Sequence, residues 1–334
     1  MRILACCPYG YYGGRAASYE YLSFVEIPRR LGHTVQHFDY AAAAAANREA
    51  MNEFFLHAAK TGGYDLVFVM TLGEEFLPQT LDEARRYVPT LAWNCDDDYR
   101  WDEYSRHYAP HYTFMVTTYR HVYEANRAAH PNLRLSQWGC TGFDDGLATA
   151  KDIAFSFVGG GHGVRLYQIE RLRRLAGLQA FGKAVPPPRS TLQRWCRALA
   201  QRLPGVTLAA ESTELPDQAA VKALWNRSKI SFTPLDATRG AVTQIKARVF
   251  DMGLSGTVML CTHNPLLHEF YEPGQEYVEF NRVDDCAEKV RWLLQHDAER
   301  RAIAERYYRR TRSEHLWEHR FRRLFGELGL SRSG

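Results

Sequence analysis

Three consecutive aspartates, Asp96 to Asp98, lie in the stretch AWNCDDDYRWDEY, which covers residues 92–104. Carboxylates this close together repel one another when ionised, so they are tolerated in water, against a cation, or with one member protonated. Three roles follow from these states: a solvated loop, a metal site or a general base. Crowding suits the last role, because neighbouring negative charge raises the pKa of a carboxyl toward the value that a base needs.

A metal site would use the Asp-x-Asp spacing of Asp96 and Asp98, since Mg²⁺ takes one or two carboxylates together with phosphate oxygens. The rings of Trp93 and Trp101 flank the aspartates and offer flat faces on which sugars stack. We predict that Asp97 or Asp98 is the general base, or that it binds the substrate that carries the reacting hydroxyl, called the acceptor below. Asp96, Trp93 and Trp101 are predicted to line the site of this acceptor. A solvated loop is the remaining interpretation.

Cationic and acidic side chains recur after residue 244. Lys246 and Arg248 begin a predicted helix and can hold a diphosphate, and Asp251 on the same helix can accept both hydroxyls of a ribose. All three lie at the carboxyl edge of the same predicted sheet, where open α/β folds bind their ligands. These are side chains that can together bind a sugar nucleotide.

The stretch THNP, residues 262–265, opens a further helix. Its N-terminal residues, Asn264, Pro265 and Leu266, are expected to present backbone amides to the phosphate or the sugar. His263 in the same loop can bind phosphate or assist the leaving group, although a merely exposed or capping role is favoured for a loop histidine. His162 has the same two interpretations.

A run of glycines, FVGGGHGVR at residues 157–165, lies between a predicted strand and a predicted helix. Gly160 and Gly161 allow the backbone to approach a ligand closely, and the amides at a helix start favour phosphate. The run lacks the G-x-G-x-x-G spacing followed by an acid after the next strand, so a dinucleotide cofactor is poorly supported. The second glycine-containing loop, Tyr12 to Gly14, is either a flexible loop facing the ligand or a structural turn.

Short apolar runs alternate with helical patterns along the whole chain, which predicts α/β domains with parallel sheets covered on both faces. Strands are expected at residues 2–7, 33–40, 64–70, 89–94, 112–118 and 133–139, and then at 153–160, 178–182, 229–235, 257–262 and 277–280. The pattern restarts after a polar gap at residues 144–152. Two doubly wound domains with the ligand at the carboxyl ends of their strands follow from this arrangement.

Composition is that of an ordinary globular protein: the 334 residues are 46% hydrophobic and 24% charged, with a net charge of +4. Seven scattered cysteines without a C-x-x-C pair suggest a reduced, cytoplasmic compartment. The C-terminal segment 297–325 holds nine arginines and four glutamates. It is either a solvated helical face, with Trp317, Phe321, Leu324 and Phe325 packed inward, or a surface for anionic lipid or polyanion.

The sequence resembles a known family over residues 150–325. It is similar to the GT-B glycosyltransferases, in particular the CgeB-like (spore maturation protein-like) group with its C-terminal glycosyl transferases group 1 domain. The similarity rests on FVGG followed by Arg165, on WNRSKISFTPL, on R-x-F-D-x-G-x-x-G-T-x-x-L from Arg248 to Leu260, on EFYEPGQEYVEF and on EHLWEHRFRRL. The first half is similar through the W-x-x-D-D stretch that begins at Trp93.

The resemblance implies a GT-B fold of two Rossmann-like domains facing a central cleft. The acceptor-side domain would cover residues 1–148 and the donor-binding domain residues 149–310, with a helix in 311–334 packing back toward the first domain. It also implies roles for the donor-binding residues, with residues 181–183 holding the base: Gly160, Gly161, Arg165, Lys183, Pro234, Lys246, Arg248, Asp251, His263, Asn264, Pro265 and Leu266.

Two departures from the family pattern matter. Many relatives have glutamate at the ribose position, where this chain has Asp251, and the E-x7-E pattern of many retaining enzymes would place its first acid at Thr243. Retaining stereochemistry is therefore not supported. Positive side chains can neutralise the leaving diphosphate in this arrangement, so no metal and no further cofactor is expected.

The leading hypothesis is a cytoplasmic glycosyltransferase that moves a sugar from a UDP, GDP or dTDP donor to a glycan, glycolipid or other glycoconjugate. Peripheral attachment to the inner face of a membrane through the basic C-terminal region fits a lipid-linked acceptor. Two alternatives remain open. One is a non-catalytic sugar-nucleotide or glycan-binding module with the same fold, and the other is a glycosyltransferase that acts on modified DNA.

Overall fold

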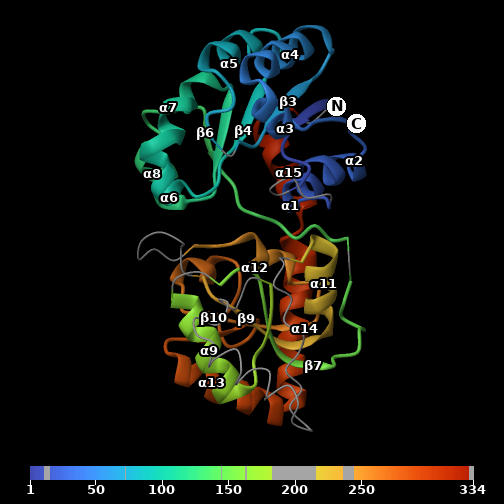
Figure 1. The fold of residues 1–334 in the computed structure, drawn as a ribbon, viewed down its shortest axis with the longest axis vertical. Coiled ribbons are helices and arrows are strands. Elements are labelled where there is room, and N and C mark those ends of the chain that lie inside the picture. The colour runs from blue at the N-terminus through green and yellow to red at the C-terminus, as the bar shows by residue number, and fades with distance from the viewer. Residues whose placement is uncertain are drawn as a thin grey trace, which may run out of the picture. The chain divides into compact units, whose positions relative to one another are not determined.

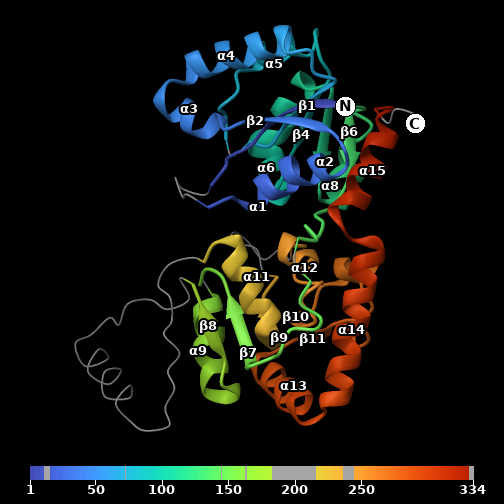
Figure 2. The ribbon, with the colours of Figure 1, turned by 90° about the vertical axis from the view of Figure 1, so that its right-hand side faces the viewer.

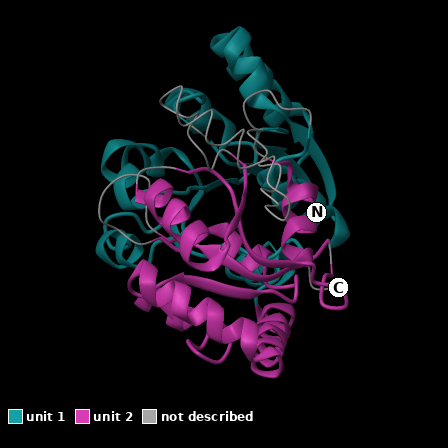
Figure 3. Cartoon of the chain, turned by 60° about the horizontal axis from the view of Figure 1, so that its bottom comes forward, with its two compact units in different colours: residues 1–141, 315–334 teal, residues 142–314 magenta. Residues whose placement is uncertain are grey.

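The structure, a computed structural model, divides into two compact units (Figure 3). Unit 1 comprises residues 1–141 and 315–334, and unit 2 comprises residues 142–314. Each unit is an α/β layer structure built on a parallel sheet (Figure 1). The residues that the structure describes are 1–10, 16–71, 73–143, 145–161, 164–182, 216–235 and 244–330.

The sheet of unit 1 has six parallel strands in the order β2-β1-β3-β4-β5-β6. All six strands predicted from the first half of the sequence are confirmed. The inner strands are fully buried because helices cover both faces, which is why they read as continuous apolar runs. Their bounds are Arg2–Cys6, Thr34–Phe38, Leu66–Val69, Thr90–Trp93, Phe114–Thr117 and Leu133–Leu135.

The helices of unit 1 are short, apart from the 11-residue α15 and the longest helix, α4. Its first turn is capped by the side chain of Asn47, which accepts a hydrogen bond from the amide of Ala50 at 3.0 Å. The helices are α1 Tyr19–Tyr21, η2 Leu22–Glu26, α2 Ile27–Arg30, α3 Tyr40–Ala46, α4 Arg48–Thr61, α5 Pro78–Ala84, α6 Asp97–Arg100, η3 Trp101–Ser105, α7 Arg106–Tyr108, η4 Ala109–His111, α8 Arg120–Asn126 and α15 Trp317–Glu327.

The sheet of unit 2 has five parallel strands in the order β11-β10-β9-β7-β8. These are the five strands predicted from the second half of the sequence. They span Ile153–Val158 (β7), Gln179–Phe181 (β8), Ser228–Thr233 (β9), Val258–Thr262 (β10) and Val278–Phe280 (β11). All strands run in one direction, so the loops that follow them share one edge of the sheet.

Helices α9 and α13 lie side by side in unit 2 (Figure 1). Arg171 on α9 makes a two-pronged ion pair with Asp284 on α13, with Nη2 at 2.7 and 2.9 Å from the carboxylate oxygens. The described helices of this unit are α9 Val164–Ala176, α11 Gln218–Arg227, α12 Ala247–Asp251, η5 Pro265–Glu269, α13 Val283–Gln295 and α14 Asp297–Glu314.

The C-terminal helix α15 belongs to the core of unit 1 (Figure 2). Trp317 is fully buried and packs in T-shaped contacts against Trp93 and Phe24 at centroid distances of 5.0 and 5.3 Å. Its indole nitrogen donates to the hydroxyl of Tyr19, which in turn donates to the carbonyl of Gly139. A Cβ atom at Gly139 would lie 2.8 Å from the Trp317 amide nitrogen, so only glycine allows this approach.

The arginines of the C-terminal segment are held largely in ion pairs along α14 and α15. The pairs are Arg300 and Arg301 with Asp297, Arg309 with Glu305, Arg310 with Glu314, Arg312 with Asp145 and Arg323 with Glu327. The four apolar side chains predicted to face inward, Trp317, Phe321, Leu324 and Phe325, are buried. The solvated-face interpretation therefore describes this segment, and no helix in the described ranges is both long and apolar enough to cross a membrane.

We predict that Trp317→Ala lowers the free energy of unfolding by about 3–5 kcal/mol, because it removes a large aromatic side chain from a packed core. Denaturant unfolding followed by circular dichroism measures this loss. Trp292→Ala is the matched control, since that side chain is 46% exposed and its loss costs little. Equal destabilisation by the two substitutions would show that α15 does not belong to the core of unit 1.

Candidate functional site

The carboxyl edge of the unit 2 sheet gathers several of the residues predicted to bind a donor. Gly159 to Gly161 follow β7, Gly182 follows β8, Pro234 follows β9 and His263 follows β10. Helix α12, which carries Lys246 as its N-cap residue, starts near the same edge. This is the edge at which parallel α/β sheets bind ligands.

Arg248 lies directly against the backbone at the end of β7. Its Nη1 donates to the carbonyl of Val158 at 2.9 Å. A Cβ atom at position 159 would lie 3.0 Å from Nη2, and Gly159 has a φ of +141°, so both space and backbone favour glycine. Gly182 repeats this constraint, because a Cβ there would lie 2.6 Å from the Gly159 carbonyl oxygen.

Gly159 was not among the predicted site residues, and Gly182 was included only in the range 181–183 predicted to hold the base. The glycines predicted to approach the ligand were Gly160 and Gly161, which are only partly buried. The signal that could have pointed to Gly159 is its position as the first residue after the strand, where an approaching side chain meets the backbone. Gly182 likewise follows a strand, β8, and the requirement for glycine there comes from the carbonyl of Gly159 in the neighbouring loop.

Two arginines share this part of unit 2. Burial and the nearby charge of Arg165 lower the pKa of Arg248 to about 10, and within the described ranges no carboxylate contributes to that shift. The guanidinium of Arg248 therefore remains charged at neutral pH. Arg165 is buried at the start of α9, whereas Arg248 is partly exposed as a residue although its guanidinium is largely shielded from water. An anion bound here would relieve the repulsion between the two like charges.

Lys246 contributes a third positive charge to this edge. Its ammonium donates to the carbonyl of Pro234 at 3.4 Å, which places it at the end of β9. Pro234 itself is buried and lacks an N–H group, so its polar contribution is the carbonyl that Lys246 contacts. The predicted pairing of Lys246 and Arg248 near one ligand is geometrically consistent with this arrangement.

Asp251 does not occupy the position expected of a ribose ligand. Its carboxylate forms an ion pair with Lys222 of α11 at 3.1 Å, and the two side chains are only 1% and 7% exposed. A carboxylate that is 1% exposed and neutralised by a buried lysine is closed to a ribose in this structure. The ribose assignment is therefore corrected to a structural one, which ties α12 to α11.

The amides from Asn264 to Leu266 are also not available to a ligand. The Asn264 amide donates to Glu279 at 3.4 Å, Pro265 has no amide hydrogen, and the Leu266 amide donates to the side-chain oxygen of Asn264 at 3.1 Å. The helix that follows, η5, is a five-residue 3-10 helix. The prediction of amide donation at this helix start is therefore wrong.

The side chain of Asn264 offers a different contact. It is fully buried, and its Nδ2 has no hydrogen-bond acceptor among the described residues. A buried amide nitrogen without an acceptor costs about 1–3 kcal/mol, which a ligand oxygen would recover. Asn264 thus stays a candidate donor-binding residue through its side chain.

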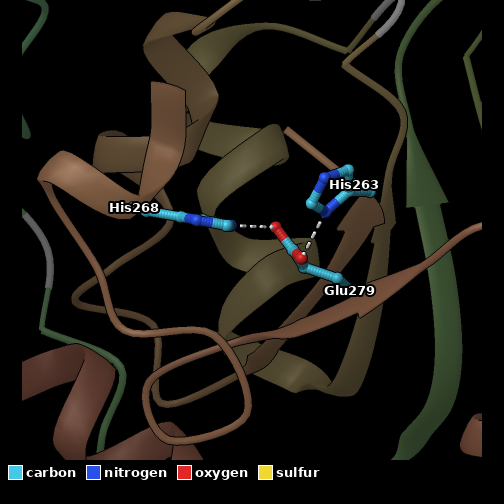
Figure 4. A group of neighbouring side chains, drawn as sticks. All are labelled: His263, His268 and Glu279. Carbon is cyan, nitrogen blue, oxygen red and sulfur yellow. Dashed lines mark hydrogen bonds and ion pairs between the residues drawn. The ribbon is translucent and has the colours of Figure 1, made fainter. Parts of the chain in front are cut away.

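His263 belongs to a cluster with His268 and Glu279, and Figure 4 shows the three side chains. His263 Nδ1 lies 2.8 Å from one carboxylate oxygen of Glu279, and His268 Nε2 lies 3.0 Å from the other. Burial opposes ionisation of Glu279, but hydrogen bonds from His263, Tyr277, His268 and the Asn264 amide outweigh it and lower its pKa. The sequence analysis identified neither His268 nor Glu279 as site residues.

The three aspartates of unit 1 differ in their surroundings. Asp97 is 1% exposed and accepts a hydrogen bond from Ser105 Oγ at 2.6 Å, whereas Asp96 and Asp98 are partly exposed. Burial raises the pKa of Asp97 to about 6, although the hydroxyls of Ser105 and Thr117 oppose the shift. Asp96 has a positive φ of 60°, an uncommon conformation for a residue other than glycine.

Trp93 and Trp101 are not positioned to stack on a sugar. Trp93 is fully buried, and Trp101 is 6% exposed with its ring against the edge of His130 at 5.3 Å. The sequence could not separate these rings from surface ones, because aromatic residues beside a polar loop suit either place. Both are therefore corrected from acceptor contacts to core residues.

Some residues named in the sequence analysis lie outside the part of the chain that the structure describes. They are Tyr12, Gly13 and Gly14 of the second glycine-containing loop, His162, Lys183 of the predicted base site, and Thr243.

Comparison with known proteins gives a family match for one part of the chain. Residues 166–326 match the family model described as Glycosyl transferase-like. No curated protein matches the chain significantly. The narrower CgeB-like assignment is not distinguished by this match.

Solved structures resemble the chain over nearly its whole length. Anabaena Alr3699/HepE in complex with UDP and glucose has a TM-score of 0.61 at 12% identity, covering 98% of this chain and 99% of that chain. The sucrose-phosphate synthase from Thermosynechococcus elongatus has a TM-score of 0.59 at 11% identity, with the same coverage. An alpha-glucosyltransferase in complex with UDP and a 13-mer DNA containing a HMU base reaches 0.65 at 10% identity, again covering 98% and 99%.

These likenesses confirm the predicted fold, a GT-B arrangement of two parallel α/β sheets with helices. The domain at residues 166–326 is similar to the Glycosyl transferase-like family.

We predict a pH-dependent gain in stability for Asp97→Asn. The raised pKa means that the folded protein binds the Asp97 proton more tightly than the unfolded chain, so wild-type stability falls as pH rises from about 4 to about 6 and stays lower above that. Asparagine keeps the oxygen that Ser105 contacts and carries no charge. Above about pH 6 the variant is expected to be more stable by about 2–3 kcal/mol.

Urea unfolding of both proteins between about pH 4 and pH 8 measures this difference. The gain should fall below about 1 kcal/mol at the acid end, where Asp97 is protonated in the folded protein and about half protonated in the unfolded chain. Asp102→Asn is the matched control, because that side chain is 77% exposed and pairs only with Arg106. A stability difference that does not change with pH would contradict burial as the cause of the raised pKa.

Proposed function

We propose that this glycosyltransferase moves a sugar from a nucleoside diphosphate donor to a hydroxyl of a glycan, glycolipid or other glycoconjugate. The observation that carries the proposal is the guanidinium group of Arg248, held against the backbone at Val158 and Gly159 with the like charge of Arg165 nearby. The donor would bind unit 2, and the acidic stretch of unit 1 would serve the acceptor. Membership of the CgeB-like group is the narrower form of this proposal.

The chemistry of transfer explains why a desolvated arginine pair would be useful. The bond that breaks joins the sugar to the diphosphate, so negative charge develops on the departing phosphate oxygen. Positive groups fixed in a site with little water stabilise that charge strongly, and they need no rearrangement as the reaction proceeds. Arg248, partly exposed and held by the Val158 carbonyl, is placed to act on the diphosphate, with Arg165 and Lys246 adding charge.

UDP is the donor nucleotide that we propose. The support is that the Anabaena protein and the DNA-glucosylating neighbour were both solved with UDP. The side chain of Asn264 and the partly exposed glycines Gly160 and Gly161 would contact the sugar or the phosphates from the same edge of the sheet. GDP and dTDP donors stay as alternatives that the binding experiment separates.

On the acceptor side we propose Asp98 as the general base and Asp97 as a residue that positions it. Asp98 is partly exposed and follows the buried Asp97 at the start of α6, so it can meet an incoming hydroxyl. The positive φ of Asp96 fixes the turn into this helix. Strained backbone of this kind is common at functional sites, where the surrounding fold holds it in place.

A second candidate function is transfer to modified DNA. The observation in its favour is the likeness to a glucosyltransferase solved with DNA that contains a HMU base. The ion pairs that occupy many arginines of α14 and α15 weigh against a broad phosphate-binding surface on those helices. Salt-dependent binding of a duplex would favour the DNA acceptor, and its absence would leave the glycoconjugate.

We predict that Arg248→Ala weakens binding of the UDP-sugar by roughly 10- to 100-fold, the loss expected for hydrogen bonds to a charged group. Calorimetry with UDP-, GDP-, dTDP- and CMP-linked sugars measures the affinity of wild type and variant. Arg171→Ala is the matched control, because it removes an arginine of α9 that pairs with Asp284. No binding of any nucleotide sugar by the wild type would overturn the proposed function, and unchanged affinity in Arg248→Ala would overturn this site.

We predict that Asp98→Asn lowers turnover by roughly 10²- to 10⁴-fold while donor affinity stays the same, as expected when only a general base is lost. Release of UDP from the donor, with water or a panel of acceptors, measures turnover. Asp102→Asn again serves as the control on the neighbouring turn. Full activity of Asp98→Asn would return the aspartates to a solvated loop. Donor binding without turnover by the wild type across the panel would indicate a non-catalytic module.

A further inference from the structure

The cluster of His263, His268 and Glu279 has a composition that the proposed transfer reaction does not require. Three elements contribute to it: the loop after β10 carries His263, η5 carries His268, and β11 carries Glu279. Both imidazole rings point toward one carboxylate (Figure 4). We propose that these three side chains bind a divalent transition metal ion of the Zn²⁺ class.

The spacing of the ligand atoms fits such an ion. The three atoms lie within 4.8 Å of one another, with Nδ1 of His263 and Nε2 of His268 at 2.8 and 3.0 Å from the carboxylate of Glu279. Ligand atoms around a tetrahedral zinc are roughly 3.3 Å apart, given metal–ligand bonds of about 2.0–2.1 Å. Small rotations of two histidine side chains therefore suffice to admit the ion.

The ligand types select the class of metal. Two imidazoles and one carboxylate form a donor set that suits zinc and its neighbours in the first transition row. Mg²⁺ and Ca²⁺ prefer oxygen ligands, of which this cluster supplies one side chain. A magnesium-type site is therefore not what these residues offer.

The hydrogen bonds around Glu279 resemble those that orient a carboxylate bound to a metal ion. The hydroxyl of Tyr277 donates to one oxygen at 2.7 Å, and the amide of Asn264 approaches the same oxygen at 3.4 Å. Outer hydrogen bonds of this kind fix the direction of a ligating carboxylate. The Glu279 side chain is 17% exposed, and the hydrogen bonds from Tyr277 and Asn264 hold it in place before any ion binds.

The histidines supply access to the site. Their side chains are 48% exposed for His263 and 38% exposed for His268. With three protein ligands, a tetrahedral ion keeps a position for water or another oxygen ligand. Because the ligands come from three successive elements, the ion would fasten the loop that contains Asn264 to the edge strand β11.

The proposal is tested by zinc binding to protein that has first been treated with EDTA. Competition with a chromogenic chelator is expected to give one tight Zn²⁺ per chain, and His268→Gln is expected to weaken binding at least about tenfold. Co²⁺ in place of zinc should give the visible absorption of a four-coordinate ion in the wild type only. An equal concentration of Mg²⁺ should not displace the zinc.

Two features of the design keep the result unambiguous. The chain has 13 histidines, so His296→Gln is the matched control; it removes an exposed histidine of the same unit that contacts the Trp292 carbonyl. His268→Gln is preferred to a Glu279 variant, because Glu279 also accepts from Tyr277 and Asn264. Absence of a one-to-one zinc complex in the wild type, or equal affinities in the two histidine variants, would overturn the proposal.

Discussion

The desolvated guanidinium of Arg248 is the constraint on which the proposed donor site depends. A positive charge that is removed from water and placed near Arg165 is unfavourable unless something offsets it. The fold supplies one partner, the Val158 carbonyl, and a glycine that leaves room for the guanidinium. An anionic ligand would supply the rest, so the same arrangement that disfavours the empty state favours a diphosphate.

The position of Arg248 is maintained by contacts on the other side of its helix. Helix α12 has only five residues, too few for a stable helix by itself. The buried ion pair of Asp251 with Lys222 joins it to α11, and the hydroxyl of Tyr307 on α14 donates to the Val249 carbonyl. Asp251 is one turn from Arg248, so an acid expected to bind the ligand contributes instead by holding the arginine in place.

The strands could be predicted from the sequence because a central parallel strand, which is buried on both faces, is a continuous run of apolar residues. It could not predict which polar atoms were already paired, because those partners are distant in the chain. Lys222 lies 29 positions before Asp251, and Glu279 lies 15 after the Asn264 amide that it accepts from. Trp93 shows the same limit, since its burial depends on α15, which is more than 200 positions away. Local spacing identified Arg248 correctly as part of a cationic edge, but not the glycine that it contacts.

Both units hold an ionisable side chain in an environment that disfavours its charge. In unit 2 this lowers the pKa of Arg248, and in unit 1 it raises the pKa of Asp97. Each residue lies in the first turn of a helix of fewer than six residues. Such positions cost stability, and a protein retains them where a ligand or a reacting hydroxyl uses the stored electrostatic energy. The two shifts have opposite sign because burial disfavours the charged form, which is the protonated form of arginine and the deprotonated form of aspartate.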